Sequence, residues 1–422
     1  MVQEITANEF ETEVLNHDGP VILDFYSTEC PPCEALAPKL EAVQSQYGDG
    51  LKIVKILRQD HRDFSLSMNV RSSPTLLFYS KGKEVAPRLS GAILKGSLVK
   101  HIETMFGLKA KGGKPPLRVE KVDVLIIGAG PAGLSAAIYT SRAKLKTVVL
   151  DKGTPGGQVN LTHLVANYPG TEQPINGYFL MHKMTEQAKA TGATIMMAVE
   201  INQLDLNKRS VIVDETLIID YKVMIIATGS KPRSLGAQGE ERLFGKGISY
   251  CATCDGAFYE GKKVLVIGGG NSAVEEALFL TKYVSELTII HQFDTFQANA
   301  TAVEEAMNHP KIKVLFHHEP RQFLGENHFE GLVVEDLQTH QTKTITDADG
   351  VFVFIGYQAQ NELVKDQLVL DQGGYIVVDE DMMTSLEGVF AAGDIRSKKY
   401  RQITTAVSDG TIAALSAEKY LL

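Results

Sequence analysis

The sequence predicts an α/β protein with more than one domain, and three observations support this fold class. At 422 residues the chain exceeds the size at which one hydrophobic core is usual. Residues 122–133 and 264–273 each have the pattern of a strand, a glycine loop and the start of a helix. From residue 122 onward, apolar strands alternate with helical patterns, which is typical of doubly wound α/β domains.

Residues 1–108 are expected to form a separate first domain. Its predicted elements are a helical segment at 8–15, strands at 21–26, 51–56 and 75–79, and a helix that begins near Cys30-Pro-Pro-Cys33. Residues 109–119 are rich in Gly, Pro and Lys and have no apolar periodicity. That composition predicts a linker between the first domain and the rest of the chain.

The charge balance disfavours several partners. Lys and Arg number 42 against 51 Asp and Glu, which gives a net charge of −9. This leaves no broad basic surface, so we expect neither nucleic acid nor an anionic membrane as a main partner. The first residues have no basic start followed by an apolar stretch, and no apolar run approaches about 18 residues. We therefore expect a cytoplasmic protein.

The four cysteines form two pairs, Cys30/Cys33 and Cys251/Cys254, each with two intervening residues. Two such pairs could bind zinc together, but structural zinc sites usually have their halves closer in sequence. Purely structural disulfides are uncommon in cytosolic proteins. Reversible thiol–disulfide exchange is the favoured interpretation, and we expect no metal site.

The first glycine loop predicts a dinucleotide site. Gly128, Gly130 and Gly133 follow an apolar strand and open a helix, and Asp151 ends the next strand. Glycines allow close approach of a pyrophosphate, the helix N-terminus offers its amides, and the carboxylate can hold a ribose hydroxyl. The alternative is a glycine-rich turn without a ligand.

A second loop, with Gly268, Gly270 and Ala273 at the corresponding positions, predicts another dinucleotide site. Alanine at the third position still permits close packing of helix on strand. Two dinucleotides imply a hydride donor and a flavin, because a nicotinamide transfers two electrons as hydride and a flavin can pass them to a disulfide.

A series of motifs gives a more specific resemblance. In chain order they are Gly156-Gly157-Gln158, Asn167-Tyr168-Pro169-Gly170, Ala227-Thr228-Gly229, Cys251-Ala-Thr-Cys254-Asp255-Gly256, Ala391-Ala392-Gly393-Asp394 and Arg401-Gln402. Over residues 120–422 this series resembles the low-molecular-weight, bacterial-type thioredoxin reductases. The resemblance implies an FAD-binding Rossmann-like domain at 120–233 and 358–422, interrupted by an NAD(P)H-binding domain at 234–357. It also implies a homodimer.

The resemblance implies roles for individual residues. Cys254 would face the flavin, Cys251 would exchange with the protein substrate, and Asp255 would act as the acid; alternatively, Asp255 caps a turn before Gly256. The implied flavin-site residues are Gly128, Gly130, Pro131, Ala132, Gly133, Asp151, Gly157, Gln158, Asn167, Ala227, Thr228, Gly229, Gly393, Asp394, Arg401, Gln402 and Ile403. For Asp394 and Arg401 the alternative is an ordinary surface ion pair.

Residues 1–108 resemble thioredoxin. The matching features are Asp24 in a strand, Cys30-Pro-Pro-Cys33 opening a helix that contains Pro38, Lys55 in the third strand, and Ser73-Pro74-Thr75. The resemblance implies a thioredoxin fold in which Cys30 attacks a disulfide and Cys33 resolves it, because a helix N-terminus lowers the pKa of Cys30. Asp24 and Pro74 complete the implied catalytic set. In the alternative, this domain only recruits partners.

Two residues depart from the thioredoxin pattern. Glu29 stands where a tryptophan usually precedes the first cysteine, and Pro32 replaces the common glycine. A carboxylate beside Cys30 opposes thiolate formation and would discourage acidic targets. Protein disulfides, such as those of peroxiredoxins, are the expected substrates, and a dedicated peroxiredoxin-reducing flavoprotein is an alternative function.

The hydride donor is expected to be NADH rather than NADPH. Members of the reductase family that use NADPH carry a His-Arg-Arg cluster and a further arginine, whereas residues 291–297 read His-Gln-Phe-Asp-Thr-Phe-Gln. A 2′-phosphate usually needs guanidinium contacts, but a ribose hydroxyl could be bound by Gln292 or His291. Ferredoxin as donor is the alternative. The expected nicotinamide-site residues are Gly268, Gly270, Asn271, Ser272, Ala273, Glu275, His291 and Gln292.

Overall fold

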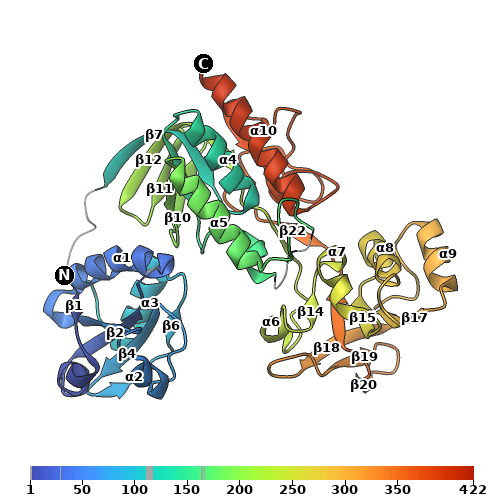
Figure 1. Cartoon of the computed structure of the whole chain (residues 1–422), viewed down its shortest axis with the longest axis horizontal. Helices are drawn as coiled ribbons and strands as arrows, with labels where there is room; N and C mark the ends of the chain where they lie inside the picture. Colours follow the sequence, from blue (N-terminus) through green and yellow to red (C-terminus); the bar gives the residue numbers. More distant parts are fainter. Residues whose placement is uncertain (1, 29, 111–116, 163–164, 166) are drawn as a thin grey trace.

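The computed structural model describes residues 2–28, 30–110, 117–162, 165 and 167–422, without the side chains of Leu161 and Cys254. Figure 1 shows three globular parts, which we call the first domain, the seven-stranded domain and the five-stranded domain. The prediction of a multidomain α/β protein is confirmed. Among the helices of the described residues, none combines the length and apolar character needed to cross a membrane.

The first domain has a mixed sheet with strand order β1-β3-β2-β4-β5, in which β6 also pairs with β4. The central strand β2 pairs in parallel with β3 and antiparallel with β4, and helices lie against both faces of the sheet. The elements are β1 (Gln3–Glu4), β2 (Pro20–Tyr26), α1 (Pro31–Tyr47), β3 (Lys52–Leu57), α2 (Arg62–Ser67), β4 (Thr75–Ser80), β5 (Lys83–Glu84), β6 (Leu89–Ser90) and α3 (Lys95–Phe106).

The helical segment expected at 8–15 is divided into two short pieces. A 3₁₀ turn spans Ala7–Glu9 and a π-helical turn spans Glu11–Leu15. The carboxylate of Glu9 accepts hydrogen bonds from the backbone and the hydroxyl of Thr6, which fixes a capping box before the first piece. Apolar periodicity does not predict such local hydrogen bonds, so the break between the two pieces was not expected.

The seven-stranded domain is built around β7 and β12, which are parallel neighbours at its centre. The strand order is β10-β11-β12-β7-β8-β9, and β23 also pairs with β12. The elements are β7 (Arg118–Ile127), α4 (Pro131–Arg142), β8 (Thr147–Leu150), η4 (Gly157–Leu161), α5 (Gly177–Ala190), β9 (Thr194–Met196), β10 (Ile201–Asp205), β11 (Ser210–Val213), β12 (Leu217–Ile226), β23 (Val389–Ala391), η6 (Gly393–Ile395) and α10 (Ile403–Leu421).

Helices α4, α5 and α10 cover one face of this sheet. Nine of the twelve residues of α4 are buried, which explains its small and apolar composition. A Cβ atom at Gly410 of α10 would collide with the carbonyl of Ala132 in α4, so the two helices cross at a point where only glycine fits. Their crossing joins two segments that are far apart in sequence.

A two-stranded antiparallel ribbon of β13 (Ser230–Pro232) and β22 (Tyr357–Ala359) lies between the seven-stranded and five-stranded domains. The domain boundaries expected at 233/234 and 357/358 lie at this ribbon.

The five-stranded domain contains a fully parallel sheet of order β14-β21-β15-β16-β17 and a separate antiparallel sheet of β18, β19 and β20. Its elements are α6 (Glu240–Leu243), β14 (Ile248–Ser249), α7 (Ala252–Asp255), η5 (Gly256–Tyr259), β15 (Lys263–Ile267), α8 (Asn271–Leu280), β16 (Glu286–Ile290), α9 (Ala300–Asn308), β17 (Ile312–Leu315), β18 (His318–Leu324), β19 (Gly331–Asp336), β20 (Thr342–Ile345) and β21 (Gly350–Val353).

Candidate active site

A cavity of about 830 Å³ opens at the carboxyl end of β7, where the first glycine loop turns into α4. At Gly130, which directly precedes α4, an added Cβ would meet no atom within 4 Å, so the loop faces open space. At Gly133 an added Cβ would collide with the carbonyl of Gly128, so this position requires glycine. The loop therefore leaves room for a pyrophosphate beside the amides of a helix N-terminus.

Asp151 is positioned at the cavity by two backbone groups. Its carboxylate accepts hydrogen bonds from the amides of Ala129 (2.7 Å) and Gly153 (2.7 Å). Burial raises the pKa of this carboxyl, and the two amide bonds oppose the shift. A carboxylate has about four acceptor positions, so two remain for the hydroxyls of a ribose.

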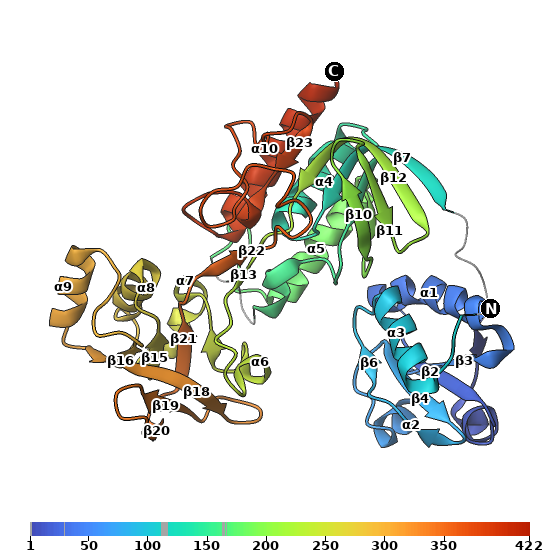
Figure 2. The ribbon, with the colours of Figure 1, turned by 180° about the vertical axis from the view of Figure 1, so that it is seen from behind.

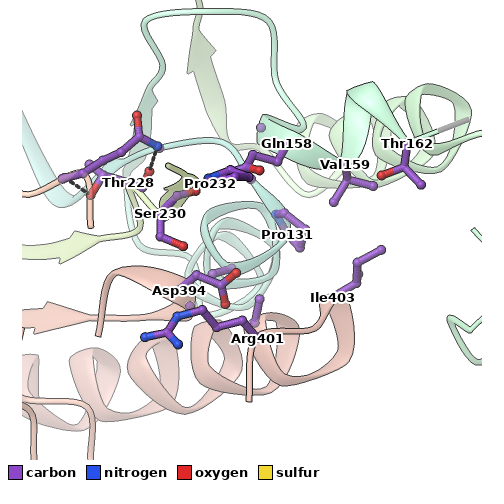
Figure 3. Close-up of a pocket in the computed structure, with 18 of the residues that line it drawn as sticks. Pro131, Gln158, Val159, Thr162, Thr228, Ser230, Pro232, Asp394, Arg401 and Ile403 are labelled. Carbon is purple, nitrogen blue, oxygen red and sulfur yellow. Dashed lines mark hydrogen bonds between the residues drawn. The ribbon is translucent and has the colours of Figure 1, made fainter. Parts of the chain in front are cut away.

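Side chains from three separate segments surround the cavity (Figure 3). Gln158, Val159 and Thr162 come from η4 and the residue after it, Thr228, Ser230 and Pro232 follow β12, and Asp394, Arg401 and Ile403 precede or begin α10. The side-chain amide of Gln158 donates to the carbonyl of Ser230. Thr228 is fixed by Gln360, whose backbone carbonyl accepts its hydroxyl at 2.8 Å.

The C-terminal side of the cavity carries charged groups. Asp394 forms an ion pair with Lys398 at 3.2 Å, and burial raises the pKa of its carboxyl while the Lys398 ammonium lowers it. The guanidinium of Arg401 lies over the ring of Tyr375 at 4.1 Å, and its buried Nε has no hydrogen-bond partner within the described part of the chain. Arg401 is thus a cavity-lining donor that remains available to a ligand.

The five-stranded domain contributes Cys251 and Asp255 to the lining of the same cavity. Cys251 is disulfide-bonded and directly precedes α7, and Asp255 ends that helix. The side chain of Cys254 lies outside the described part of the chain. The structure therefore brings Cys251 and the first glycine loop to one cavity, although they are more than a hundred positions apart in sequence.

Ser249 links the acid to the cysteine segment and was missed by the sequence reasoning. Its hydroxyl donates to Asp255 Oδ2 at 2.6 Å and accepts from the backbone amide of Cys251 at 3.1 Å. Ser249 is buried, but the sequence shows only a serine two residues before the cysteine, and serine at such a spacing is too common to be specific.

Gln402 lines the cavity and connects the seven-stranded domain with the five-stranded domain. Its side-chain oxygen accepts a hydrogen bond from Asn167 (3.2 Å), and its amide nitrogen lies 3.5 Å from the hydroxyl of Thr253. Thr253 Oγ1 in turn lies 3.5 Å from Cys251 Sγ. Two expected flavin-site residues thus contact each other and reach the cysteine segment.

The second glycine loop follows β15 and leads into α8. An added Cβ at Gly268 would collide with the carbonyl of Phe354, so this position also requires glycine. Asn271 Oδ1 accepts from the backbone amide of Asn299 at 2.7 Å, so its side chain holds the chain segment before α9. Glu275 is exposed on α8, whereas its neighbour Glu276 has a buried Oε2 without a partner within the described residues.

His291 and Gln292 differ in exposure. The ring of His291 is only 5% exposed, its Nε2 lies 3.1 Å from Gln297 Oε1, and the ring stacks on Phe296. Burial lowers the pKa of His291, and its hydrogen bonds with Gln297 and Thr295 oppose the shift. Gln292 is exposed beside it. Of these two candidate ribose ligands, only Gln292 faces solvent.

In the first domain, Cys30 and Cys33 form a disulfide at the start of α1. Cys30 is the N-cap residue of this helix, and its Sγ accepts from the backbone amide of Cys33 at 3.3 Å. Sγ of Cys30 also lies 3.6 Å from the carbonyl oxygen of Ser73, which precedes Pro74 in a cis peptide bond. Glu29, expected to influence the pKa of Cys30, lies outside the described residues.

Asp24 lies in β2, the strand that precedes the disulfide in the chain, and is 5% exposed. Its Oδ1 has no hydrogen-bond partner within the described part of the chain. Burial raises the pKa of the carboxyl from 3.8 to about 7, and the charge of Lys55 on β3 opposes the shift. A carboxyl with such a pKa can exchange a proton near neutral pH.

Comparison with known proteins agrees with this arrangement. Residues 122–410 match the family model described as pyridine nucleotide-disulphide oxidoreductase. The chain belongs to this family. Residues 1–104 match the thioredoxin family model, so this oxidoreductase carries its own thioredoxin domain.

Relatives of this oxidoreductase align with its larger part. A protein of Clostridium pasteurianum named "34.2 kDa protein in rubredoxin operon" is 50% identical over 303 residues, which cover 72% of this chain and 98% of that protein. The thioredoxin reductase of Peptoclostridium acidaminophilum is 44% identical over 305 residues, 71% of this chain and 96% of that protein.

Solved structures give the same assignment. Thioredoxin reductase from Streptococcus pyogenes has a TM-score of 0.67 at 37% identity and covers 71% of this chain and 98% of its own. The enzyme from Giardia duodenalis has a TM-score of 0.66 at 35% identity and covers 72% and 99%. The chain is a thioredoxin reductase-like disulfide oxidoreductase with a thioredoxin domain at its N-terminal side, as the sequence predicted. Among the described residues, no cluster of three or more His, Cys, Asp or Glu side chains could hold a metal ion.

Proposed function

We propose that this enzyme passes electrons from NADH through FAD and Cys251/Cys254 to Cys30/Cys33, and from there to disulfides of other proteins. The observation that carries the proposal is the shared cavity. The seven-stranded domain contributes the first glycine loop to its lining, and the five-stranded domain contributes Cys251 and Asp255. A redox cofactor held by the loop would lie in the same space as the cysteine segment. FAD, when bound, supplies the chemistry that links a hydride donor to a disulfide.

The residues around the cavity are suited to FAD. The open backbone at Gly130 accommodates a pyrophosphate, and the two remaining acceptor positions of Asp151 suit ribose hydroxyls. The unpartnered Nε of Arg401 and the carboxylate of Asp394 provide a donor and an acceptor on the opposite side. Asn167 and Gln402 would position the cofactor near the cysteine segment.

Disulfide exchange follows from the chemistry of the two cysteine pairs. When Cys251/Cys254 is reduced, the Cys251 thiolate attacks Cys30, and Cys33 leaves as a thiolate that takes up a proton. Cys254 then displaces Cys30 from the mixed disulfide, so two electrons pass to Cys30/Cys33. Asp255 is the proposed proton donor during exchange, and the Ser249 hydroxyl, which bonds both the Asp255 carboxylate and the Cys251 amide, would hold that carboxylate in place.

NADH is the proposed hydride donor, bound at the second glycine loop. Gln292 is exposed and uncharged, so it suits a ribose hydroxyl, while exposed Asp294 would repel a 2′-phosphate. Because His291 is buried and already has hydrogen-bond partners, we assign the ribose contact to Gln292 alone. The proposed enzyme is a homodimer, and peroxiredoxin disulfides are among its proposed acceptors.

A pair of variants tests the relay. Cys30→Ser should lose NADH-dependent reduction of a protein disulfide by at least about a hundredfold, because Cys30 is the attacking thiol and Cys33 alone cannot form and reopen the Cys30/Cys33 disulfide. It should keep normal reduction of an added, separate thioredoxin, which depends on Cys251.

Ser27→Ala, beside the Cys30/Cys33 site, is the matched control and should retain both activities. Unchanged activity of Cys30→Ser without added thioredoxin would show that the domain only recruits partners.

A further inference from the structure

A buried lysine joins the thioredoxin domain to the seven-stranded domain. Lys39 in α1 is 7% exposed, and its Nζ donates to the carbonyl of Ile93 in its own domain (3.1 Å) and to the carbonyl of Ala198 in the other. Lysine ammonium groups are almost never fully buried without partners, because their desolvation is costly. Lys39 is therefore specifically accommodated by this contact between the domains.

The carbonyl of Ala198, which accepts from Lys39, belongs to a series of hydrogen bonds that ends at Asp151, the residue proposed to bind a ribose of FAD. Ala198 is buried and has φ of 53°, a left-handed conformation that favours glycine over alanine. Its amide donates to the carbonyl of Gly153 at 3.1 Å, and the amide of Gly153 donates to Asp151 Oδ1 at 2.7 Å. Lys39 is thus connected to Asp151 through two backbone links.

A second contact involves the start of α3. Its N-cap residue, Leu94, has no side chain that can cap the helix, and the first turn contains no acidic residue. A Cβ added to Gly96 would lie 2.5 Å from Glu200 Oε2, so a carboxylate of the seven-stranded domain lies against this turn. A negative charge at a helix N-terminus is stabilising, and Glu200 supplies the one that α3 lacks.

Leu94 also lines the cavity, together with Asp151, Val199, Glu200 and Ile201. Because Asp151 marks the ribose end of a dinucleotide in this fold, Leu94 lies at the adenosine end. We propose that the docked thioredoxin domain forms a wall of the flavin site: Lys39 and Glu200 hold it in place, and Leu94 covers the adenosine part of FAD. This inference rests on the proposed function, in which the cavity binds FAD.

The contact has a reciprocal consequence. If docking strengthens FAD binding, FAD must favour docking by the same factor. Helix α1, which begins at the Cys30/Cys33 pair, and helix α7, which follows Cys251, lie well apart in both views (Figures 1 and 2). The docked domain therefore holds the flavin, and it must leave this position, or meet another subunit, to receive electrons from Cys251.

The test uses the full-length apoprotein, titrated with FAD while the quenching of flavin fluorescence is followed. Gly96→Leu places a bulky side chain against Glu200, lies outside the cavity lining, and favours the helix because leucine is a better helix former than glycine. Lys39→Met removes the ammonium and keeps a long apolar side chain. Both should raise the Kd for FAD about tenfold, which is roughly 1.4 kcal/mol. Lys100→Met, at an exposed position of α3, is the matched control and should bind as the parent does.

Hydrogen exchange gives a second readout. Adding FAD to the apoprotein should protect the backbone amides of residues 93–98 and 198–201, and Gly96→Leu should abolish the protection in 93–98. Equal FAD affinity in the parent, Gly96→Leu and Lys39→Met would overturn the inference while leaving FAD binding intact. A parent chain that does not bind FAD would instead overturn the proposed function, and this inference with it.

Discussion

Replacing Asp24 by asparagine should remove most of the pH dependence of the thioredoxin domain's stability near neutral pH. The carboxyl is 5% exposed, and its pKa is raised from 3.8 to about 7 by burial, with the charge of Lys55 as the opposing influence. The folded domain therefore binds this proton more tightly than the unfolded chain. Asp24 stabilises the fold least when it is ionised, so stability falls as the pH rises from about 4 to about 7 and then levels off.

The magnitude follows from the shift. Three pKa units at about 1.4 kcal/mol each give roughly 4 kcal/mol over the whole range, of which about 3 kcal/mol falls between roughly pH 5 and 8.5. An asparagine side chain cannot ionise, so at about pH 8.5 the Asp24→Asn variant should be more stable than the parent by up to the full value of roughly 4 kcal/mol. An unsatisfied amide in the same place will reduce the gain by about 1–3 kcal/mol at every pH.

Native-state hydrogen exchange of peptides from β2 and β4, in the oxidised protein, reports on this domain separately from the others. The quantity to compare is the difference between parent and variant at each pH, because other groups also titrate. Asp18→Asn, at an exposed loop position, is the matched control for the same change of side chain. Parallel profiles of the parent and Asp24→Asn would contradict the expected effect, and so would a gain in stability of the parent relative to the variant as the pH rises.

Three further outcomes are expected. Ser249→Ala should slow reduction of disulfides about tenfold and alter its pH profile, since Asp255 loses the 2.6 Å hydrogen bond that orients it; an unchanged profile would remove Ser249 from the mechanism. Cys33→Ser should accumulate mixed disulfides with client proteins on Cys30, detectable by non-reducing electrophoresis, and capture of Cys251 alone would argue against external clients. Steady-state kinetics should favour NADH, and Gln292→Arg with Gln297→Arg should shift the preference toward NADPH; a tenfold preference of the parent for NADPH would contradict the charge argument.

The fold could largely be predicted because its signals are local. Apolar runs before glycine loops predicted β7 and β15 and the helices that follow them, and the CxxC pair predicted the start of α1. Each of these depends on residues within about ten positions of one another. The division of the segment at 8–15 into two short turns was not predicted, because it depends on the side-chain bonds between Thr6 and Glu9 rather than on apolar spacing.

Residues of the cavity could be predicted from the sequence only where they belong to a recognisable motif. The glycine loops and cysteine pairs carry recognisable spacing, but Lys39 and Leu94 belong to no motif. Their roles arise from contact with the seven-stranded domain, whose contacting residues lie about a hundred residues later in the chain. Helical periodicity alone cannot distinguish a buried lysine from an exposed one. The same limit applies to His291, whose burial depends on packing against Phe296 and Gln297.

The crossing of α10 over α4 determines when the cavity can form during synthesis. The carbonyl of Ala132 packs against Gly410, the amide of Gly393 donates to Asp409 Oδ2 at 3.2 Å, and the cavity wall includes Arg401.

The five-stranded domain, contained within residues 234–357, is translated before any of α10. Domains generally fold in the order in which they emerge, so the thioredoxin and five-stranded domains can fold while the seven-stranded domain still lacks one of its covering helices. We therefore expect the proposed cofactor to bind only after α10 has left the ribosome, and a stall before residue 393 to yield a chain with folded domains but an incomplete cavity.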